Sequence, residues 1–165
     1  MRLTRYLLAP ALAATMAFMG PPWISIETPP NPYDSASRDA YLLVHTFHHG
    51  TPVPNPISGT AEGIVDGARR TVALEFGNTS RPGVYALRKQ WPEKGVWTLV
   101  IAATQGEGES NTAKAVVEIG TNGQVASVVV PTQMRNGYRV PAPVNMSDVE
   151  TALRTRAGRF AAAKR

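Results

Sequence analysis

The feature that constrains the fold most is the spacing of apolar residues between positions 23 and 130, where short runs alternate with turns rich in glycine and proline. Val72, Leu74 and Phe76, for example, occupy every second position of one run, which gives an extended strand one buried face. Asp66-Gly67 lies between two runs and is a strong hairpin signal, because glycine readily adopts a positive φ. No helical spacing of apolar residues occurs before residue 146. About eight short strands in this arrangement predict a mainly β, antiparallel sandwich or barrel.

Residues 82–120 are the most informative part of this region. The pattern predicts three strands, with Trp97, Leu99 and Ile101 on the core-facing side of the middle one. Residues 83–85 (GVY) and, after a turn, 95–101 (GVWTLVI) resemble the final strands of bacterial exported immunoglobulin-like domains, with YtkA-like and carboxypeptidase-regulatory-like domains as the nearest groups. The resemblance implies an immunoglobulin-like antiparallel β-sandwich and a non-catalytic role in binding or assembly, and it names no ligand.

Residues 1–20 predict an export signal. Two arginines give a positive start, and an uncharged apolar run of about fifteen residues follows, whereas a helix that spans a bilayer needs roughly 20. We therefore expect a cleaved signal peptide and a periplasmic or secreted protein; an uncleaved membrane anchor is the alternative. The sandwich then occupies residues 21–130, a linker residues 131–145, and a basic C-terminal helix residues 146–165.

The net charge of +5 belongs to the two ends of the chain. Residues 1–20 hold two arginines and no acid, residues 146–165 hold five basic and two acidic side chains, and residues 21–145 hold ten of each sign. A neutral domain lacks the basic stripe that binds phosphates, so we expect no nucleic-acid partner. The absence of cysteine excludes disulfides, thiolate metal sites and cysteine nucleophiles.

Residues 146–165 predict an amphipathic helix. Ser147 followed by Glu150 is a capping box. Apolar residues recur at three- and four-residue spacing on one stripe, made of Met146, Val149, Leu153, Ala157 and Phe160. We expect this thin stripe to pack on the chain's own domain; weak contact of the basic side chains with an anionic membrane surface is the alternative. The partner is expected to be an unknown protein or envelope component.

All three histidines, His45, His48 and His49, lie within five residues, and imidazole is the commonest ligand of transition metals. On an extended strand, however, His45 and His49 lie on one face about 13 Å apart, and His48 points to the other face. Ligand bonds of about 2 Å do not close over that distance. Only a bulge, or an early strand end near His48, brings two of them together. A copper or zinc site at the three histidines, in a periplasmic metal-binding protein, is the rival hypothesis.

No catalytic constellation occurs in the sequence, which has neither a Gly-x-Ser-x-Gly elbow nor a phosphate-binding loop. Trp23, Trp91 and Trp97 could form a carbohydrate platform, but tryptophans of a small sandwich are more often part of the core. We therefore predict an exported, non-enzymatic binding or structural module with no cofactor, whose ligand the sequence does not name.

Overall fold

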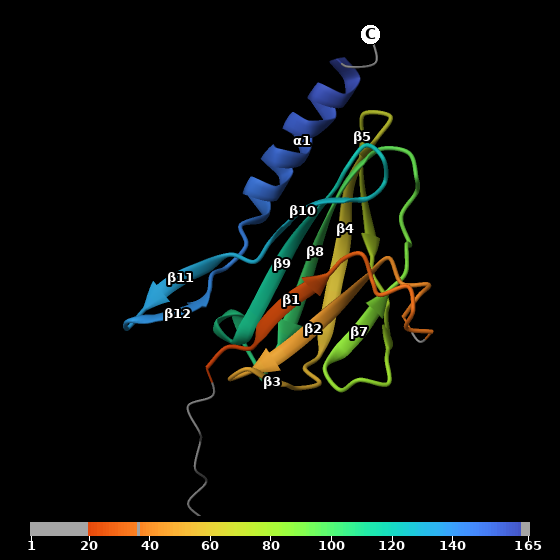
Figure 1. Ribbon diagram of the computed structural model, residues 1–165. Helices are drawn as coiled ribbons and strands as arrows, with labels where there is room; N and C mark the ends of the chain where they lie inside the picture. Colours follow the sequence, from red (N-terminus) through yellow and green to blue (C-terminus); the bar gives the residue numbers. More distant parts are fainter. Residues whose placement is uncertain (1–19, 36, 163–165) are drawn as a thin grey trace, which may run out of the picture.

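The computed structural model describes residues 20–35 and 37–162 (Figure 1). The predicted signal segment, apart from Gly20, lies outside the described residues. Within the described residues, no helix is long and apolar enough to cross a membrane.

Two antiparallel sheets make up most of the described chain and lie face to face (Figure 1). The strands of the first sheet are, in order, β1 (Trp23–Glu27), β2 (Leu42–His48), β7 (Val84–Leu87) and β6 (Phe76–Asn78), with the short β3 (Thr51–Pro52) beside β2. The strands of the second sheet are, in order, β10 (Val125–Val129), β9 (Thr112–Ile119), β8 (Val96–Thr104), β4 (Ile57–Val65) and β5 (Ala68–Ala73). The predicted mainly β, antiparallel architecture is confirmed.

The core lies between the two sheets. Trp97, Leu99 and Ile101 of β8 are at most 2% exposed, as their alternation predicted. Leu87 of the facing sheet is fully buried with them, and Tyr85 packs partly against the same cluster. The predicted register of residues 82–120 is therefore confirmed.

A glycine makes room for the largest side chain of this core. Gly63 of β4 pairs with Trp97 of β8, and a Cβ atom built at position 63 would lie 2.4 Å from the indole ring. Heavy atoms do not approach so closely, so the indole can lie over the β4 backbone only because residue 63 has no side chain.

The chain crosses from one sheet to the other near Leu74. The alternation of Val72, Leu74 and Phe76 predicted a single strand, but β5 ends just before Leu74 and β6 begins at Phe76 in the other sheet. The Leu74 amide donates to the Gly59 carbonyl oxygen at 3.0 Å, so the crossing keeps this backbone hydrogen bond. Leu74 belongs to the core cluster and Phe76 packs against it. The alternate residues therefore face the core as predicted, although the strand is interrupted between them.

The predicted hairpin at Asp66-Gly67 joins β4 to β5, and both turn residues have positive φ, 51° and 78°. This pair of angles is the one that the tight turns of hairpins require, and it accounts for the Asp-Gly signal.

A second hairpin lies where the sequence analysis expected a linker, within residues 131–145. Its strands are β11 (Thr132–Arg135) and β12 (Tyr138–Pro141), and they turn on Asn136 and Gly137 with φ of 51° and 80°. We call residues 132–141 the hairpin arm, since they project from the side of the domain (Figure 1).

The C-terminal helix α1 (Met146–Ala162) lies along the second sheet, on the face opposite the core (Figure 1). Val149 and Leu153 are its buried residues, which confirms the centre of the predicted apolar stripe. The predicted cap is corrected: the Asn145 carboxamide oxygen accepts the Ser147 amide hydrogen bond at 3.1 Å. Glu150 forms an ion pair with β5 instead of completing a capping box.

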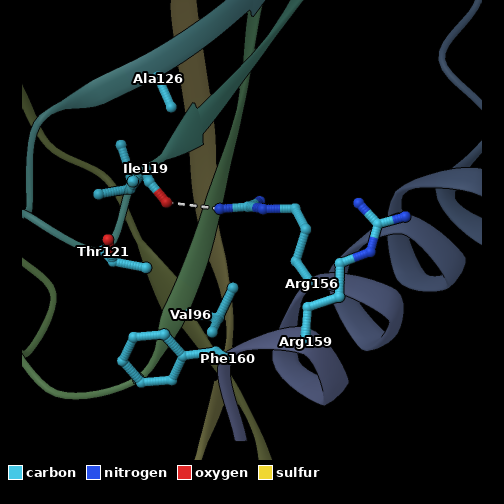
Figure 2. Close-up of a pocket in the computed structure, with 9 residues that line it drawn as sticks. Val96, Ile119, Thr121, Ala126, Arg156, Arg159 and Phe160 are labelled. Carbon is cyan, nitrogen blue, oxygen red and sulfur yellow. Dashed lines mark hydrogen bonds between the residues drawn. The ribbon is translucent and has the colours of Figure 1, made fainter. Parts of the chain in front are cut away.

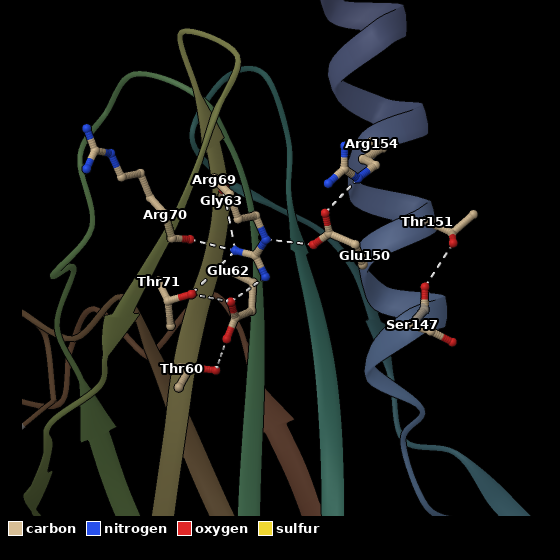
Figure 3. A network of polar contacts seen from close by, with 10 residues as sticks. All are labelled: Thr60, Glu62, Gly63, Arg69, Arg70, Thr71, Ser147, Glu150, Thr151 and Arg154. Atoms are coloured by element: carbon tan, nitrogen blue, oxygen red, sulfur yellow. Dashed lines mark hydrogen bonds and ion pairs between the residues drawn. The ribbon is translucent and has the colours of Figure 1, made fainter.

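A polar network joins this helix to the sheet (Figure 3). Arg69 of β5 donates to the carboxylates of Glu62 and Glu150, at 2.6 Å each. The Glu62 side chain is only 6% exposed. Burial favours its protonated form, but hydrogen bonds from Thr60, Thr71 and Arg69 outweigh burial and lower the pKa of Glu62.

Candidate ligand-binding cleft

Two of the three histidines come together at the end of β2. The strand ends at His48, and His49 adopts a left-handed backbone with φ of 48°. The two imidazole rings then lie edge to face, with centroids 4.2 Å apart. This is the early strand end that the sequence analysis gave as a condition for bringing two histidines together.

His45 is held separately. Its Nε2 atom lies 2.8 Å from a Glu27 carboxylate oxygen on β1, and its ring stacks on Phe47. Because side chains alternate along β2, His45 and His48 point to opposite faces of the first sheet.

The described residues contain no group of three or more histidine, aspartate or glutamate side chains that could hold a metal ion. His48 and His49 together offer two imidazole ligands, whereas a zinc site uses three or four protein ligands. The Nδ1 atom of His48 is buried and has no hydrogen-bond partner among the described residues. A buried polar atom of this kind is costly unless a water, an ion or a ligand supplies the missing partner.

An open cleft of about 710 Å³ begins at these two histidines. It lies between the end of β2, the start of the described chain at Gly20, the short 3₁₀ helix η1 (Glu109–Asn111) and the hairpin arm. Trp23 and Tyr138 add aromatic surface to its wall. We call this space the foot cleft. Its volume falls in the range of about 300–1,000 Å³ that small-ligand sites occupy.

The foot cleft carries positive charge. Arg135 and Arg139 of the hairpin arm line it, and none of the described residues that line it is Asp or Glu. In the described part of the chain, neither guanidinium has an ion-pair partner. Glu109, at the edge of this region, pairs with Lys114 at 3.2 Å. The cleft is therefore suited to a negatively charged ligand.

Sequence reasoning missed the part of the cleft that the hairpin arm supplies. The sequence predicts a linker over residues 131–145, although Asn136-Gly137 between TQMR and YRVP is the same kind of hairpin signal as Asp66-Gly67. Among the tryptophans, Trp91 and Trp97 are core residues, as expected, whereas Trp23 is only partly buried.

A second hollow, of about 260 Å³, lies between the C-terminal half of α1 and the ends of β8 and β9 (Figure 2). Arg156 reaches across it and donates to the Ile119 carbonyl oxygen at 2.5 Å and to the Thr98 hydroxyl at 2.8 Å. Its guanidinium is used to hold the helix on the sheet. Val96 and Phe160 make much of the remaining wall apolar, so this hollow mainly belongs to the packing of the helix.

Comparisons of the chain with protein-family models, with curated proteins and with solved structures found no match. The immunoglobulin-like resemblance of residues 82–120 therefore stays a prediction.

Proposed function

We propose that the chain is an exported, non-enzymatic binding module with an immunoglobulin-like β-sandwich fold, and that it holds its ligand in the foot cleft. The single observation that carries the proposal is the make-up of this cleft, where two arginines, two histidines, Trp23 and Tyr138 line one space that no described Asp or Glu lines. Two antiparallel sheets around one core are what an immunoglobulin-like domain needs. The apolar run after a positive start supports export.

Binding is tested by nuclear magnetic resonance of the purified protein with a panel of saccharides, peptides and lipid headgroups. Ligands that bind in the foot cleft are expected to shift the Trp23 indole and His48 ring signals. Arg139→Gln should weaken binding, whereas Arg70→Gln, an exposed arginine on β5, should leave it unchanged. Ligands that shift only signals of α1, or binding that is equal in both variants, would contradict the assignment of the cleft.

Export is tested by sequencing the N-terminus of the protein recovered from the cell envelope. A cleaved signal leaves a chain that lacks roughly the first 13–20 residues. A membrane-bound product with Arg2 still present would establish the anchor instead.

Copper or zinc binding is the second candidate function, and the pair of adjacent imidazoles at His48 and His49 favours it. Calorimetric titration with Cu(II) and Zn(II) tests it. Submicromolar binding that His48→Ala abolishes and His45→Ala retains would place a metal at the pair. Absence of binding, or equal binding by His48→Ala, would exclude this candidate.

A further inference from the structure

We infer that the foot cleft recognises an acidic saccharide, meaning a short chain of sugar rings that carries carboxylates. This inference rests on the proposed binding function and adds the chemical class of the ligand.

The positive charges of the cleft are separate centres. In the register of the hairpin arm, Arg135 lies opposite Tyr138 and Arg139 lies opposite Met134, so the two arginines belong to different faces of the hairpin. Both residues nevertheless line the foot cleft. Each guanidinium can bind one carboxylate through two parallel hydrogen bonds. Two such centres fit a ligand with more than one negative charge along its length.

The aromatic surface suits sugar rings. Tyr138 is 75% exposed on the hairpin arm, and Trp23 is partly exposed at the beginning of β1. Pairing of Trp23 with Phe47 across β1 and β2 fixes the backbone of Trp23 at the start of β1. Flat apolar rings with a polar edge pack against the C–H faces of sugars while their hydroxyl or indole N–H bonds to polar groups.

The remaining polar groups match hydroxyls. Ser110, Asn111 and Asn136 also line the cleft. Hydroxyl and carboxamide groups both donate and accept hydrogen bonds, as sugar hydroxyls do. The backbone near these residues is turn and 3₁₀ helix. Residues 49, 110 and 136 therefore offer no straight strand edge. In the described chain β11 and β12 pair only with each other, so triglutamate tests whether an acidic peptide adds there as a further strand.

The test measures affinity of the purified protein for three probes of equal length: trigalacturonate, neutral trigalactose and triglutamate. We expect trigalacturonate to bind at least tenfold more tightly than either of the others. Arg135→Gln and Arg139→Gln should each weaken trigalacturonate binding about tenfold, and added salt should weaken it further. Arg70→Gln is the matched control and should bind as the unmodified protein does.

The aromatic contribution is tested with Tyr138→Ala, because an exposed hairpin side chain can be removed without loss of folding. This variant should bind trigalacturonate several-fold more weakly while its denaturation midpoint is unchanged. Trp23→Ala serves as the second aromatic variant.

The outcomes separate the inference from the function on which it rests. Binding of trigalactose as tight as that of trigalacturonate, with the Trp23 and His48 signals shifted by both, would overturn the acidic class and leave a binding cleft. Tighter binding of triglutamate, with no effect of Tyr138→Ala, would overturn the saccharide and favour an acidic peptide. Failure of all three probes to shift the Trp23 or His48 signals would overturn the inference, while the wider ligand panel still decides the function.

Discussion

The residue with the most consequential surroundings is Glu62, a carboxylate buried between β4 and α1. It is ionised at neutral pH because Thr60, Thr71 and Arg69 donate hydrogen bonds to it. Its pKa is therefore lower in the folded chain than in the unfolded chain. A carboxyl group with a lowered pKa stabilises the fold fully above its unfolded pKa, and that stabilisation is lost as the pH falls through the folded pKa.

Glu62→Gln is expected to lower the free energy of unfolding at pH 7 by about 2 kcal/mol, because hydrogen bonds to a charged group are lost. Below about pH 4 the difference should shrink, because the unfolded chain takes up a proton at this residue there while the folded chain, with its lowered pKa, takes it up only at lower pH. Urea denaturation of both proteins at pH 7 and pH 3 measures this. A difference that stays constant over this range would contradict the ionised, hydrogen-bonded state of Glu62.

The contact between Gly63 and Trp97 gives a second prediction for a single residue. Gly63→Ala should cost about 1–3 kcal/mol, because the new Cβ atom overlaps the indole. Gly158→Ala is the control, since Gly158 lies in α1 with no atom within 4 Å of the added Cβ, and it should stabilise the helix by up to about 1 kcal/mol. In a Trp97→Leu background the cost of Gly63→Ala should fall, which a double-mutant cycle would measure.

Among the elements, α1 depends on a small apolar contact and a larger set of polar ones. Only Val149 and Leu153 are buried, while Glu150 and Arg156 bond to the sheet beneath the helix. The basic side chains are therefore not all directed to solvent: Arg156 is half-buried and donates to strand carbonyl groups. The structure thus favours packing of the tail on its own domain, as the thin apolar stripe predicted.

Leu153→Ala is expected to cost about 2–4 kcal/mol, because a fully buried side chain is lost and a cavity stays behind. Met146→Ala, at a position that is 43% exposed, should cost less than about 1 kcal/mol. Thermal denaturation of the two variants compares them. Equal midpoints would show that α1 does not dock through this stripe.

At the scale of the whole molecule, tyrosine side chains of the first sheet and its flank join the two sheets, because their hydroxyls bond to loops that lead into strands of the second sheet. The Tyr41 hydroxyl donates to the Gly123 carbonyl oxygen at 2.7 Å, and the Tyr85 hydroxyl donates to the Asn55 carbonyl oxygen at 2.8 Å. Burial raises the pKa of Tyr41 to about 12. The two hydrogen bonds therefore hold loops of the chain against the partly buried tyrosine side chains at the edge of the core.

The raised pKa of Tyr41 predicts a loss of stability in alkali. The unfolded chain releases this proton near pH 10, so the stabilisation is complete below that pH and is lost as the pH rises through about 12. Tyr41→Phe should remove this dependence and should cost about 1 kcal/mol at pH 7. Denaturation midpoints at pH 7 and pH 11 test it; an identical decline in both proteins would assign the alkaline loss elsewhere.

Much of the fold could be predicted because its signals are local. Alternation placed Trp97, Leu99 and Ile101 in the core, and Asp66-Gly67 marked a hairpin. The crossing near Leu74 could not be predicted, because the apolar alternation continues unchanged while the strand changes its partner.

The foot cleft could not be predicted for a related reason. It joins Trp23, the histidines at the end of β2 and the hairpin arm, which are far apart in the sequence. Their proximity depends on how the sheets close and on where the hairpin arm leaves the domain, and no spacing in the sequence records either.

The placement of the two ends of the described chain has a mechanical consequence. Gly20 leaves the domain at the foot, where β1 begins, and α1 ends at the far side (Figure 1). A force applied between these ends acts along β1, perpendicular to the hydrogen bonds that join β1 to β2. The five residue pairs from Trp23 to Glu27 would then be loaded together in shear instead of being unzipped one after another, so tension on a tethered chain would meet its resistance beside the cleft.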